Sequence, residues 1–481
     1  MDSATDIVSL GAVDLSRAIH ARQVSCVEVM RAYLDRIARL NPKVNAIVAL
    51  QDPTHLLREA EARDADLARG ESRGPLHGFP QAVKDLDAVR GLPCTQGSPI
   101  FRDTVAETDS IMVERLRAGG VIFIGKTNTP EFGLGSQTYN SVYGTTRNAY
   151  DQGLTSGGSS GGAAVAVALR MQAVADGSDH AGSLRNPPAF NNLFGLRTSY
   201  GRIPNKGLDV FTPTLAVHGA IGRTPADIGL MLSVIAGADP RLPYSVPEDP
   251  KRFAGPLAGD VKGTQIAWLG DCGGHLPFEP GVLDLGRAAL DIFRDIGCTV
   301  EEACPAFDFE ALWRDWLVLR AWTVAASLRP LYEDPAKRAH MKPEAIWEVE
   351  RGLRLGADQV SAAQRGRTRW YGSLRRFMES YGFLLMPTTQ VFPFAAELPW
   401  PRTVDGRTMD TYHRWMEVVI PVTMSGLPSL DVPAGFDPRG RPTGIQIVGR
   451  TRDEFGCLQL GAAYDAATRW VETHPPALGR G

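Results

Sequence analysis

What this sequence lacks excludes several classes of function. It has no run of five or more Lys or Arg residues, and 51 basic against 54 acidic residues give a formal net charge of -3 at pH 7. Proteins that bind nucleic acid usually present a basic face, so we expect no nucleic-acid partner. No stretch of about 18 uninterrupted apolar residues is present, so neither a membrane-spanning helix nor a membrane partner is predicted.

Cysteine is scarce, and the six cysteines are scattered along the chain. They show neither CxxC spacing nor neighbouring histidines, so the sequence predicts no metal site. Residues 1–11 have neither a basic start nor a long apolar segment, which argues against a signal peptide. We therefore expect reduced thiols, a cytoplasmic location, and a protein that works without a metal or an organic cofactor.

The composition is that of a globular protein with a large buried core, with 43% hydrophobic and 22% charged residues over 481 positions. Helical patterns followed by β-rich runs recur, at 114–120 before 121–126 and at 285–297 before 299–300. This alternation predicts an α/β sandwich around a sheet that has parallel segments. Residues 307–381 indicate a helical subregion rich in Trp and Arg, and we expect most of its tryptophans to lie in the core.

Two local patterns mark the first part of the chain. Ser25 and Glu28 form a capping box before an amphipathic helix that Asn41-Pro42 is expected to end. Residues 78–85 form a short apolar strand that has Lys84 at its end. The ordinary interpretation is a surface lysine paired with Asp85. The alternative is a buried lysine, whose pKa desolvation lowers until the amine is neutral and can act as a base.

A turn rich in glycine and serine at 157–162 leads into a helix of small residues, and three interpretations compete. A phosphate-binding loop requires a following GK[ST], which is absent. The pattern Gly157-x-Ser159-x-Gly161 fits the nucleophile elbow of α/β hydrolases and would make Ser159 the nucleophile. A plain turn before a helix needs no chemistry. The elbow also requires a histidine further along the chain, and the order of residues offers His218, His275, His340 and His413.

A second segment of this kind spans 176–185, and Ser183 closes its run of small residues. Successive backbone N–H groups in such a loop can converge on one oxygen, as an oxyanion hole requires. Together with Lys84 and Ser159, this segment supplies a set of groups suited to acyl transfer without a histidine.

These segments resemble the amidase signature hydrolases. The 24-residue interval from Ser159 to Ser183 equals the family's spacing between its bridging serine and its nucleophile. The other segments that carry the resemblance are 82–85, 125–132, 195–202 and 426–436. It covers most of the chain and implies an α/β/α sandwich around a large mixed twisted sheet. It further implies a helical segment at 1–70, packed on an amidase signature domain at 71–481.

The resemblance also implies a Ser-Ser-Lys relay. Neutral Lys84 would take a proton from Ser159, which would take one from Ser183, whose oxygen attacks the acyl carbon. The peptide bond before Ser159 is expected to be cis. The backbone N–H groups of the oxyanion hole would come from His180, Ala181, Gly182 and Ser183. The residues expected to bind substrate are Gly133, Leu134 and Gly135, and the expected supporting residues are Ser160, Asp179 and Arg185.

Departures from the family pattern concern the substrate. His180 and Ala181 stand in a loop that is usually Thr-Asp-x-Gly-Gly-Ser, and Phe190-Asn191-Asn192 replaces the commoner Phe-Cys-Gly. These changes look similar to the branch that includes hydrolases of nylon-type oligoamides and related synthetic amides. We expect a monomer or homodimer that hydrolyses a small amide, with anilides and carbamates or urethanes as further substrates.

Two other functions stay open for this fold. An A-type subunit of a tRNA-dependent amidotransferase shares the relay but works within a complex of several chains. A binding protein that has lost catalysis would keep the fold, although it would not need an intact set of Lys84, Ser159 and Ser183.

Overall fold

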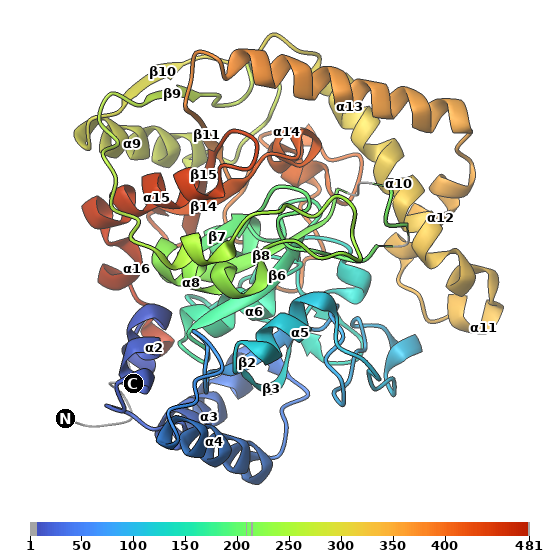
Figure 1. The fold of residues 1–481 in the computed structure, drawn as a ribbon. Helices are drawn as coiled ribbons and strands as arrows, with labels where there is room; N and C mark the ends of the chain where they lie inside the picture. Colours follow the sequence, from blue (N-terminus) through green and yellow to red (C-terminus); the bar gives the residue numbers. More distant parts are fainter. Residues whose placement is uncertain (1–6, 208, 213–214, 480–481) are drawn as a thin grey trace.

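The computed structural model describes residues 7–207, 209–212 and 215–479. Its central element is an eight-stranded mixed sheet (Figure 1). In spatial order the strands are β10 (Thr299–Glu302), β9 (Gln265–Trp268), β11 (Phe383–Pro387), β15 (Pro442–Val448), β14 (Ser429–Phe436), β7 (Phe194–Arg197), β8 (Val217–Gly222) and β6 (Val174–Asp179). The pairs β10/β9 and β9/β11 are parallel and the remaining pairs antiparallel. The predicted mixed sheet with parallel segments is confirmed.

A three-stranded sheet lies beside the β6 edge and is made of β1 (Ile47–Val48), β3 (Ile122–Thr127) and β2 (Pro80–Lys84). Side chains join the two sheets, because the backbone N–H of Lys84 donates to Asp176 Oδ2 at 3.1 Å and that of Ala82 donates to Gln172 Oε1 at 3.0 Å. The buried strand β2 therefore delivers Lys84 to the edge of β6, at the strand end that the sequence predicts.

Helices cover both faces of the eight-stranded sheet. Successive side chains of β11 point to opposite faces of the sheet. Leu385 therefore belongs to one hydrophobic core, and Leu384 and Met386 belong to the other. The first core includes α8 (Pro225–Ile235), α9 (Val282–Asp295) and α15 (Glu454–Thr468). The second includes α14 (Ile420–Ser425) and the end of α7 (Asn186–Phe190). The short helix α6 (Gly161–Ala168) packs against β6 and β2.

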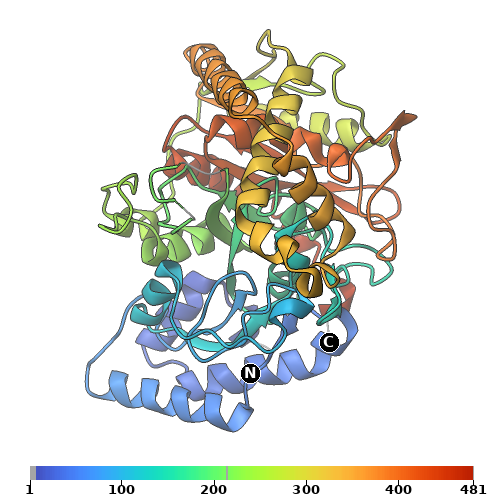
Figure 2. The same ribbon diagram turned by 90° about the vertical axis from the view of Figure 1, so that its right-hand side faces the viewer.

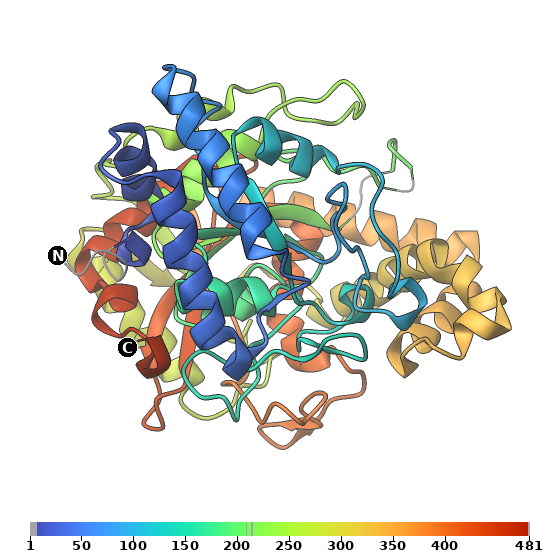
Figure 3. The same ribbon diagram turned by 90° about the horizontal axis from the view of Figure 1, so that it is seen from below.

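The N-terminal helices are α2 (Ala12–His20), α3 (Cys26–Val44) and α4 (Pro53–Ala68), and Figure 3 shows α3 and α4 side by side across the lower side of the molecule. The capping box of Ser25 is present, but α3 does not end at Asn41-Pro42 as expected. The helix passes through Pro42 because the backbone N–H of Asn45 still reaches Asn41 O at 2.7 Å and closes the last turn. The segment 1–70 is also not wholly helical, since β1 pairs with β3.

The helical cap comprises residues 309–377 and consists of α10 (Phe309–Glu333), α11 (Pro335–Arg338), α12 (Pro343–Leu353) and α13 (Ala357–Phe377). Figure 2 shows α10 running down the side of the molecule that faces the viewer, and Figure 1 shows α13 along the top of the molecule. The predicted helical subregion is thus confirmed. Of its tryptophans, Trp313, Trp316 and Trp370 are buried, whereas Trp347 is 37% exposed.

The other elements are short. They are α5 (Ile111–Ala118), α16 (Trp470–Thr473), β4 (Tyr139–Asn140), β5 (Gly144–Thr145), β12 (Thr403–Val404), β13 (Arg407–Thr408) and the 3-10 turns Pro99–Phe101, Glu131–Gly133, Pro250–Ala254, Arg414–Val419 and Ala477–Gly479. Among the residues that the structure describes, no helix combines the length and the apolar character needed to cross a membrane.

Candidate active site

Lys84 is completely buried and lies at the centre of a group of serines. Its Nζ is 2.8 Å from both Ser159 Oγ and Ser160 Oγ, and 3.2 Å from the carbonyl and the hydroxyl oxygen of Ser178. A neutral amine has two N–H donors and one lone pair. The lone pair of Nζ can therefore accept one hydrogen bond among these four contacts, and a serine hydroxyl is a suitable donor. The structure excludes the ordinary interpretation of Lys84 as a surface residue paired with Asp85.

Burial is the main reason why the pKa of Lys84 falls from its ordinary value to about 8. The carboxylates of Asp87, Asp176 and Asp179 oppose this decrease. The carboxylate of Asp87 is itself 3.0 Å from His218 Nε2, which raises the pKa of this buried imidazole, although desolvation acts in the opposite direction. A substantial fraction of Lys84 is therefore neutral at mildly alkaline pH.

Close packing explains the glycines around Ser159. The Gly158–Ser159 peptide bond is cis, as expected, and the carbonyl of Gly158 accepts from Ser136 Oγ at 2.8 Å. A Cβ added at Gly162 would lie 2.4 Å from the backbone nitrogen of Asn128. Only glycine fits where backbone approaches this closely, so the turn brings Ser159 to Lys84 by excluding side chains from its path.

Ser183 lies in the loop after β6, and the loop is held by Asp179. The Asp179 carboxylate accepts from the backbone N–H groups of Gly182, at 2.9 Å, and Leu184, at 3.1 Å. The bond to Gly182 takes one of the four N–H groups expected for the oxyanion hole. Within the described part of the chain, the N–H groups of His180, Ala181 and Ser183 have no acceptor, so three of the four expected donors are left for a substrate oxygen.

Asp179 is buried between two guanidinium groups. Arg185 contacts its two carboxylate oxygens at 3.0 Å each, and Arg197 Nη1 contacts Oδ1 at 2.9 Å. Desolvation alone would raise the pKa of Asp179, but the two guanidinium groups outweigh it and hold the pKa well below its usual range. One carboxylate against two guanidinium groups leaves a net positive charge behind the loop, which suits the formation of an oxyanion.

A cavity of about 290 Å³ opens above these groups, and both Ser159 and Ser183 line it. Ser183 is 7% exposed, and its hydroxyl has no hydrogen-bond partner among the described residues. Of the three residues expected to bind substrate, Gly133 and Leu134 line the cavity, whereas a Cβ on Gly135 would face Tyr412. The remaining lining residues are Leu86, Gln96, Phe132, Ser178, His180, Ala216, Arg320, Thr323, Val324, Ser327 and Leu328.

Most of these lining residues were not predicted. Ser178 had a weak sequence signal, because it lies two positions after Asp176 in β6 and residues at that spacing share one face of a strand. Both residues contact Lys84. The residues of α10 from Arg320 to Leu328 recur at helical spacing, but that spacing predicts only a packed face. No sequence motif connects this helix with a serine 137 positions earlier.

The histidines required by the α/β hydrolase interpretation do not lie at Ser159. Three of the four histidines contact a carboxylate: His218 contacts Asp87, His275 contacts Glu417, and His413 contacts Glu348. The fourth, His340, is exposed. Throughout the described ranges, the side-chain bond of Ser159 is with Lys84. This site therefore differs from a serine-histidine pair.

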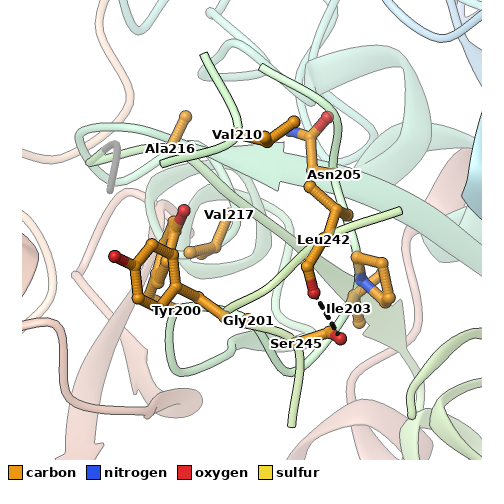
Figure 4. Close-up of a pocket in the computed structure, with 11 residues that line it drawn as sticks. Tyr200, Gly201, Ile203, Asn205, Val210, Ala216, Val217, Leu242 and Ser245 are labelled. Carbon is orange, nitrogen blue, oxygen red and sulfur yellow. Dashed lines mark hydrogen bonds between the residues drawn. The ribbon is translucent and has the colours of Figure 1, made fainter. Parts of the chain in front are cut away.

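Two other features lie outside the catalytic cavity. His275, Glu310 and Glu417 form the one group in the described chain whose ligand atoms are close enough to hold a metal ion. The guanidinium of Arg414 lies 2.6 Å from Glu310 and 2.8 Å from Glu417, so a cationic side chain already pairs with both carboxylates. Figure 4 shows a small pocket beside Tyr200 and Ala216. Its volume of about 20 Å³ suits a water molecule and is too small for a substrate.

Comparisons with known proteins identify the family of this chain. A family model described as Amidase matches residues 28–458. The acylamidase of Rhodococcus erythropolis is 34% identical over 471 residues, covering 97% of each chain. The A subunit of the glutamyl-tRNA(Gln) amidotransferase of Acidothermus cellulolyticus is 34% identical over 494 residues, covering 97% of this chain and 95% of the relative.

Two solved structures share the whole architecture. A bacterial aryl acylamidase of the amidase signature family superposes with a TM-score of 0.90 and 27% identity, covering 98% of each chain. The 6-aminohexanoate cyclic dimer hydrolase superposes with a TM-score of 0.85 over 98% of this chain and all of that one, at 24% identity, which shows the shared fold. The chain belongs to the amidase family, and it is an enzyme that acts on carbon–nitrogen amide bonds.

Proposed function

We propose that this amidase hydrolyses amides of small molecules, with anilides and carbamates among its substrates, through an acyl-enzyme formed on Ser183. The observation that carries the proposal is the 2.8 Å contact between buried Lys84 Nζ and Ser159 Oγ, at the wall of a cavity that Ser183 also lines. A lysine whose pKa falls to about 8 can serve as a base near neutrality.

In the acylation step, Ser183 Oγ attacks the acyl carbon and forms a carbon–oxygen bond. The proton of Ser183 passes to Ser159, and the proton of Ser159 passes to Lys84. The free N–H groups of His180, Ala181 and Ser183 hold the oxyanion. The carbon–nitrogen bond then breaks, and the protonated lysine returns its proton through Ser159 to the leaving nitrogen, which departs as an amine.

Deacylation repeats these steps with water. The relay takes a proton from the water, whose oxygen attacks the ester carbon, and Ser183 leaves with the returned proton. A carbamate presents the same kind of carbonyl carbon to the nucleophile, so it can enter the same sequence of steps. The free state of all six cysteines supports the proposal that the enzyme works in the cytoplasm.

The cavity volume of about 290 Å³ supports a small-molecule substrate. The cavity lining is mainly apolar on the side of Leu86 and Phe132. The names of the relatives point to acyl amides and aryl acyl amides as the classes to test first. The relation to the A subunit of an amidotransferase supports a second candidate, in which the chain releases ammonia from glutamine within a complex of several chains.

One experiment separates these functions. The purified chain is incubated with acetanilide and with glutamine, and the released aniline or ammonia is measured. We expect aniline release without any partner. A fluorophosphonate probe should modify Ser183, identified by mass spectrometry, and Ser183→Ala should abolish both labelling and turnover. Labelling on Ser159 instead, or turnover of Ser183→Ala within tenfold of the parent, would contradict the assigned nucleophile.

A further inference from the structure

Arg320 is a buried cation in the wall of the catalytic cavity, and the relay does not use it. It projects from α10 and is 4% exposed. Its Nε donates to Glu348 Oε1 at 2.5 Å, and its Nη2 donates to Tyr412 Oη at 2.8 Å. The Tyr412 hydroxyl also donates to Glu348 Oε1, at 2.7 Å. These bonds fix the guanidinium plane, because two of its three nitrogens, Nε and Nη2, are held.

The third nitrogen of this guanidinium is free. Arg320 Nη1 has no hydrogen-bond partner among the described residues, and it is not sealed from solvent. The neighbouring side chains of α10 that line the cavity use their own hydroxyls internally, since Thr323 donates to Leu319 O and Ser327 donates to Thr323 O. Arg320 therefore presents an unused donor from a face of α10 whose hydroxyl groups at the cavity are already hydrogen-bonded.

Charge determines which acceptor suits this donor. The carboxylate of Glu348 neutralises Arg320, and Tyr412, His413, His180 and Lys342 also interact with it. Burial holds the pKa of His180 well below its ordinary value, so this imidazole is uncharged, and Lys342 has the carboxylates of Glu344 and Glu131 beside it. Burial raises the pKa of Tyr412 and lowers that of His413 to about 4, so both are uncharged near neutral pH. A substrate carboxylate would add an uncompensated negative charge beside Glu348, which is costly in a buried site. A neutral oxygen accepts the same N–H without adding charge.

We propose that Arg320 is a specificity-determining residue, which donates from Nη1 to a neutral ether or carbonyl oxygen of the substrate outside the bond that is cleaved. The inference rests on the proposed function and narrows it to amides that carry such a second oxygen. A hydrogen bond from a charged donor, aimed by a fixed guanidinium, discriminates against a substrate that has carbon in the place of that oxygen.

The test uses pairs of anilides that differ by one oxygen. On the acyl side, an ω-methoxyalkanoyl anilide is compared with the alkanoyl anilide of equal chain length. On the amine side, para-methoxyacetanilide is compared with para-ethylacetanilide. The measured quantity is the ratio of kcat/KM within each pair. This ratio is then compared between each variant and the parent. Because the intrinsic reactivity of the two substrates is the same in both, it cancels in the comparison.

Arg320→Met alone would leave Glu348 buried without a partner, so the main variant is Arg320→Met combined with Glu348→Gln. We expect the oxygen preference of at least one pair to fall about 10- to 100-fold in this double variant. Arg414→Met is the matched control, because Arg414 is also a paired arginine against Trp313 but does not line the cavity. Its ratios should equal those of the parent.

Glu348→Gln alone supplies a second readout. It leaves the charge of Arg320 unbalanced, so hydrolysis of a succinyl anilide should increase relative to that of a neutral anilide. Labelling of Ser183 by a fluorophosphonate shows that each variant is folded. Equal kcat/KM within both pairs in the parent, or ratios unchanged in the double variant, would overturn the inference and leave the proposed function standing. A parent that prefers the succinyl anilide would also overturn it, and a parent that cleaves no amide would overturn both.

Discussion

The catalytic centre and the helical cap meet at one cavity but are constructed differently. The proposed catalytic centre consists of Lys84, Ser159, Ser160, Ser178 and Ser183, and Lys84 Nζ contacts the hydroxyl groups of three of these serines. The cap contributes one face of α10, on which the residues lining the cavity include both polar and apolar side chains.

The difference shows how the enzyme can keep one chemistry while its substrate changes. The proposed relay brings together groups from three separate segments, with Lys84 Nζ already 2.8 Å from Ser159 Oγ, so a small displacement of any one segment should disrupt it. The cap residues that line the cavity all project from one continuous helix, so one side chain can change without moving the others. Substitutions in the catalytic centre should therefore affect the rate with every substrate, and substitutions in the cavity wall should affect some substrates only.

The largest effect is expected for Lys84→Met, which keeps the bulk of the side chain but removes the base. We expect kcat to fall by about 10²- to 10⁴-fold with every anilide. In the parent, the rate should rise with pH through an apparent pKa near 8, because the active form is the neutral amine. This midpoint belongs to the coupled lysine and serines, and the rising limb should be absent from the variant.

Lys43→Met is the control for this pH profile, since Lys43 is exposed on α3. It should keep the rate and the limb of the parent. If Lys84→Met retained the same rising limb, another residue would be the base, and a histidine-dependent mechanism would explain the profile better.

The next largest effect is expected for Asp179→Asn, which removes the carboxylate between Arg185 and Arg197. Two guanidinium groups would remain buried without compensation, so the free energy of unfolding should fall by about 3–5 kcal/mol in urea titrations. Because the folded pKa of Asp179 lies below its unfolded value, its contribution is complete above the unfolded pKa and is lost as the pH falls. The difference between parent and variant should shrink in acid.

The matched control is Asp14→Asn, whose carboxylate is 3.1 Å from Arg17 on the surface. An exposed pair of this kind contributes at most about 1 kcal/mol. Equal destabilisation by the two substitutions would show that the charge of Asp179 does not hold the loop of Ser183.

The cavity wall is tested by Gly133→Ala against Gly135→Ala. Both glycines have a positive φ, of 68° and 100°, so alanine strains the backbone at either position. At Gly133, a Cβ would lie 2.8 Å from Leu86 Cδ1 and 3.6 Å from Ser159 Oγ, whereas at Gly135 the nearest atom, of Tyr412, is 3.9 Å away.

We therefore expect Gly133→Ala to lower kcat/KM about tenfold for a bulky anilide and less for a small aliphatic amide. Gly135→Ala should share the loss of stability but not the dependence on substrate size. The dependence is measured as the ratio of kcat/KM for the two substrates, and equal ratios in both variants would place Gly133 outside the path of the substrate.

Sequence reasoning named the residues of the proposed catalytic centre, which the structure brings together, but it named few of the residues that line the cavity. The motifs and their spacing predicted that Lys84, Ser159 and Ser183 act together. Such a prediction was possible because each residue lies in a segment whose glycines or strand pattern constrain its local structure. Sequence reasoning assigned the Gly182 N–H to the oxyanion, since nothing in the sequence shows that Asp179 accepts that N–H. It missed Arg320, because a helix from a distant part of the chain meets the serines only through tertiary packing.

The departures from the family pattern also have local explanations that only the structure provides. Asn192 has a φ of 53°, a left-handed conformation that glycine and asparagine tolerate better than most residues. Its side chain donates to Tyr150 Oη at 2.9 Å and to Trp470 O at 3.1 Å. Asparagine can thus stand in a backbone conformation that suits the commoner glycine, and its side chain ties this turn to the C-terminal helix α16.

The smallest effect is expected for His180→Ala, although His180 lies in the same loop as Ser183, the proposed nucleophile. Burial, with help from Arg320 and Arg197, holds the pKa of its imidazole well below the ordinary value, so the ring is uncharged at working pH. Its Nε2 has no partner in the described part of the chain, and its ring packs edge-on against Trp316 at 6.4 Å. Only its backbone N–H is placed to serve the oxyanion, and alanine keeps that group.

We expect kcat for acetanilide to stay within about threefold of the parent, since no hydrogen bond to the transition state is removed. The pH profile should also be unchanged, because Lys84 sets the rising limb. A loss of a hundredfold would show that the imidazole contacts the substrate, and the division between a catalytic centre and a separate cavity wall would then have to include His180 in the first.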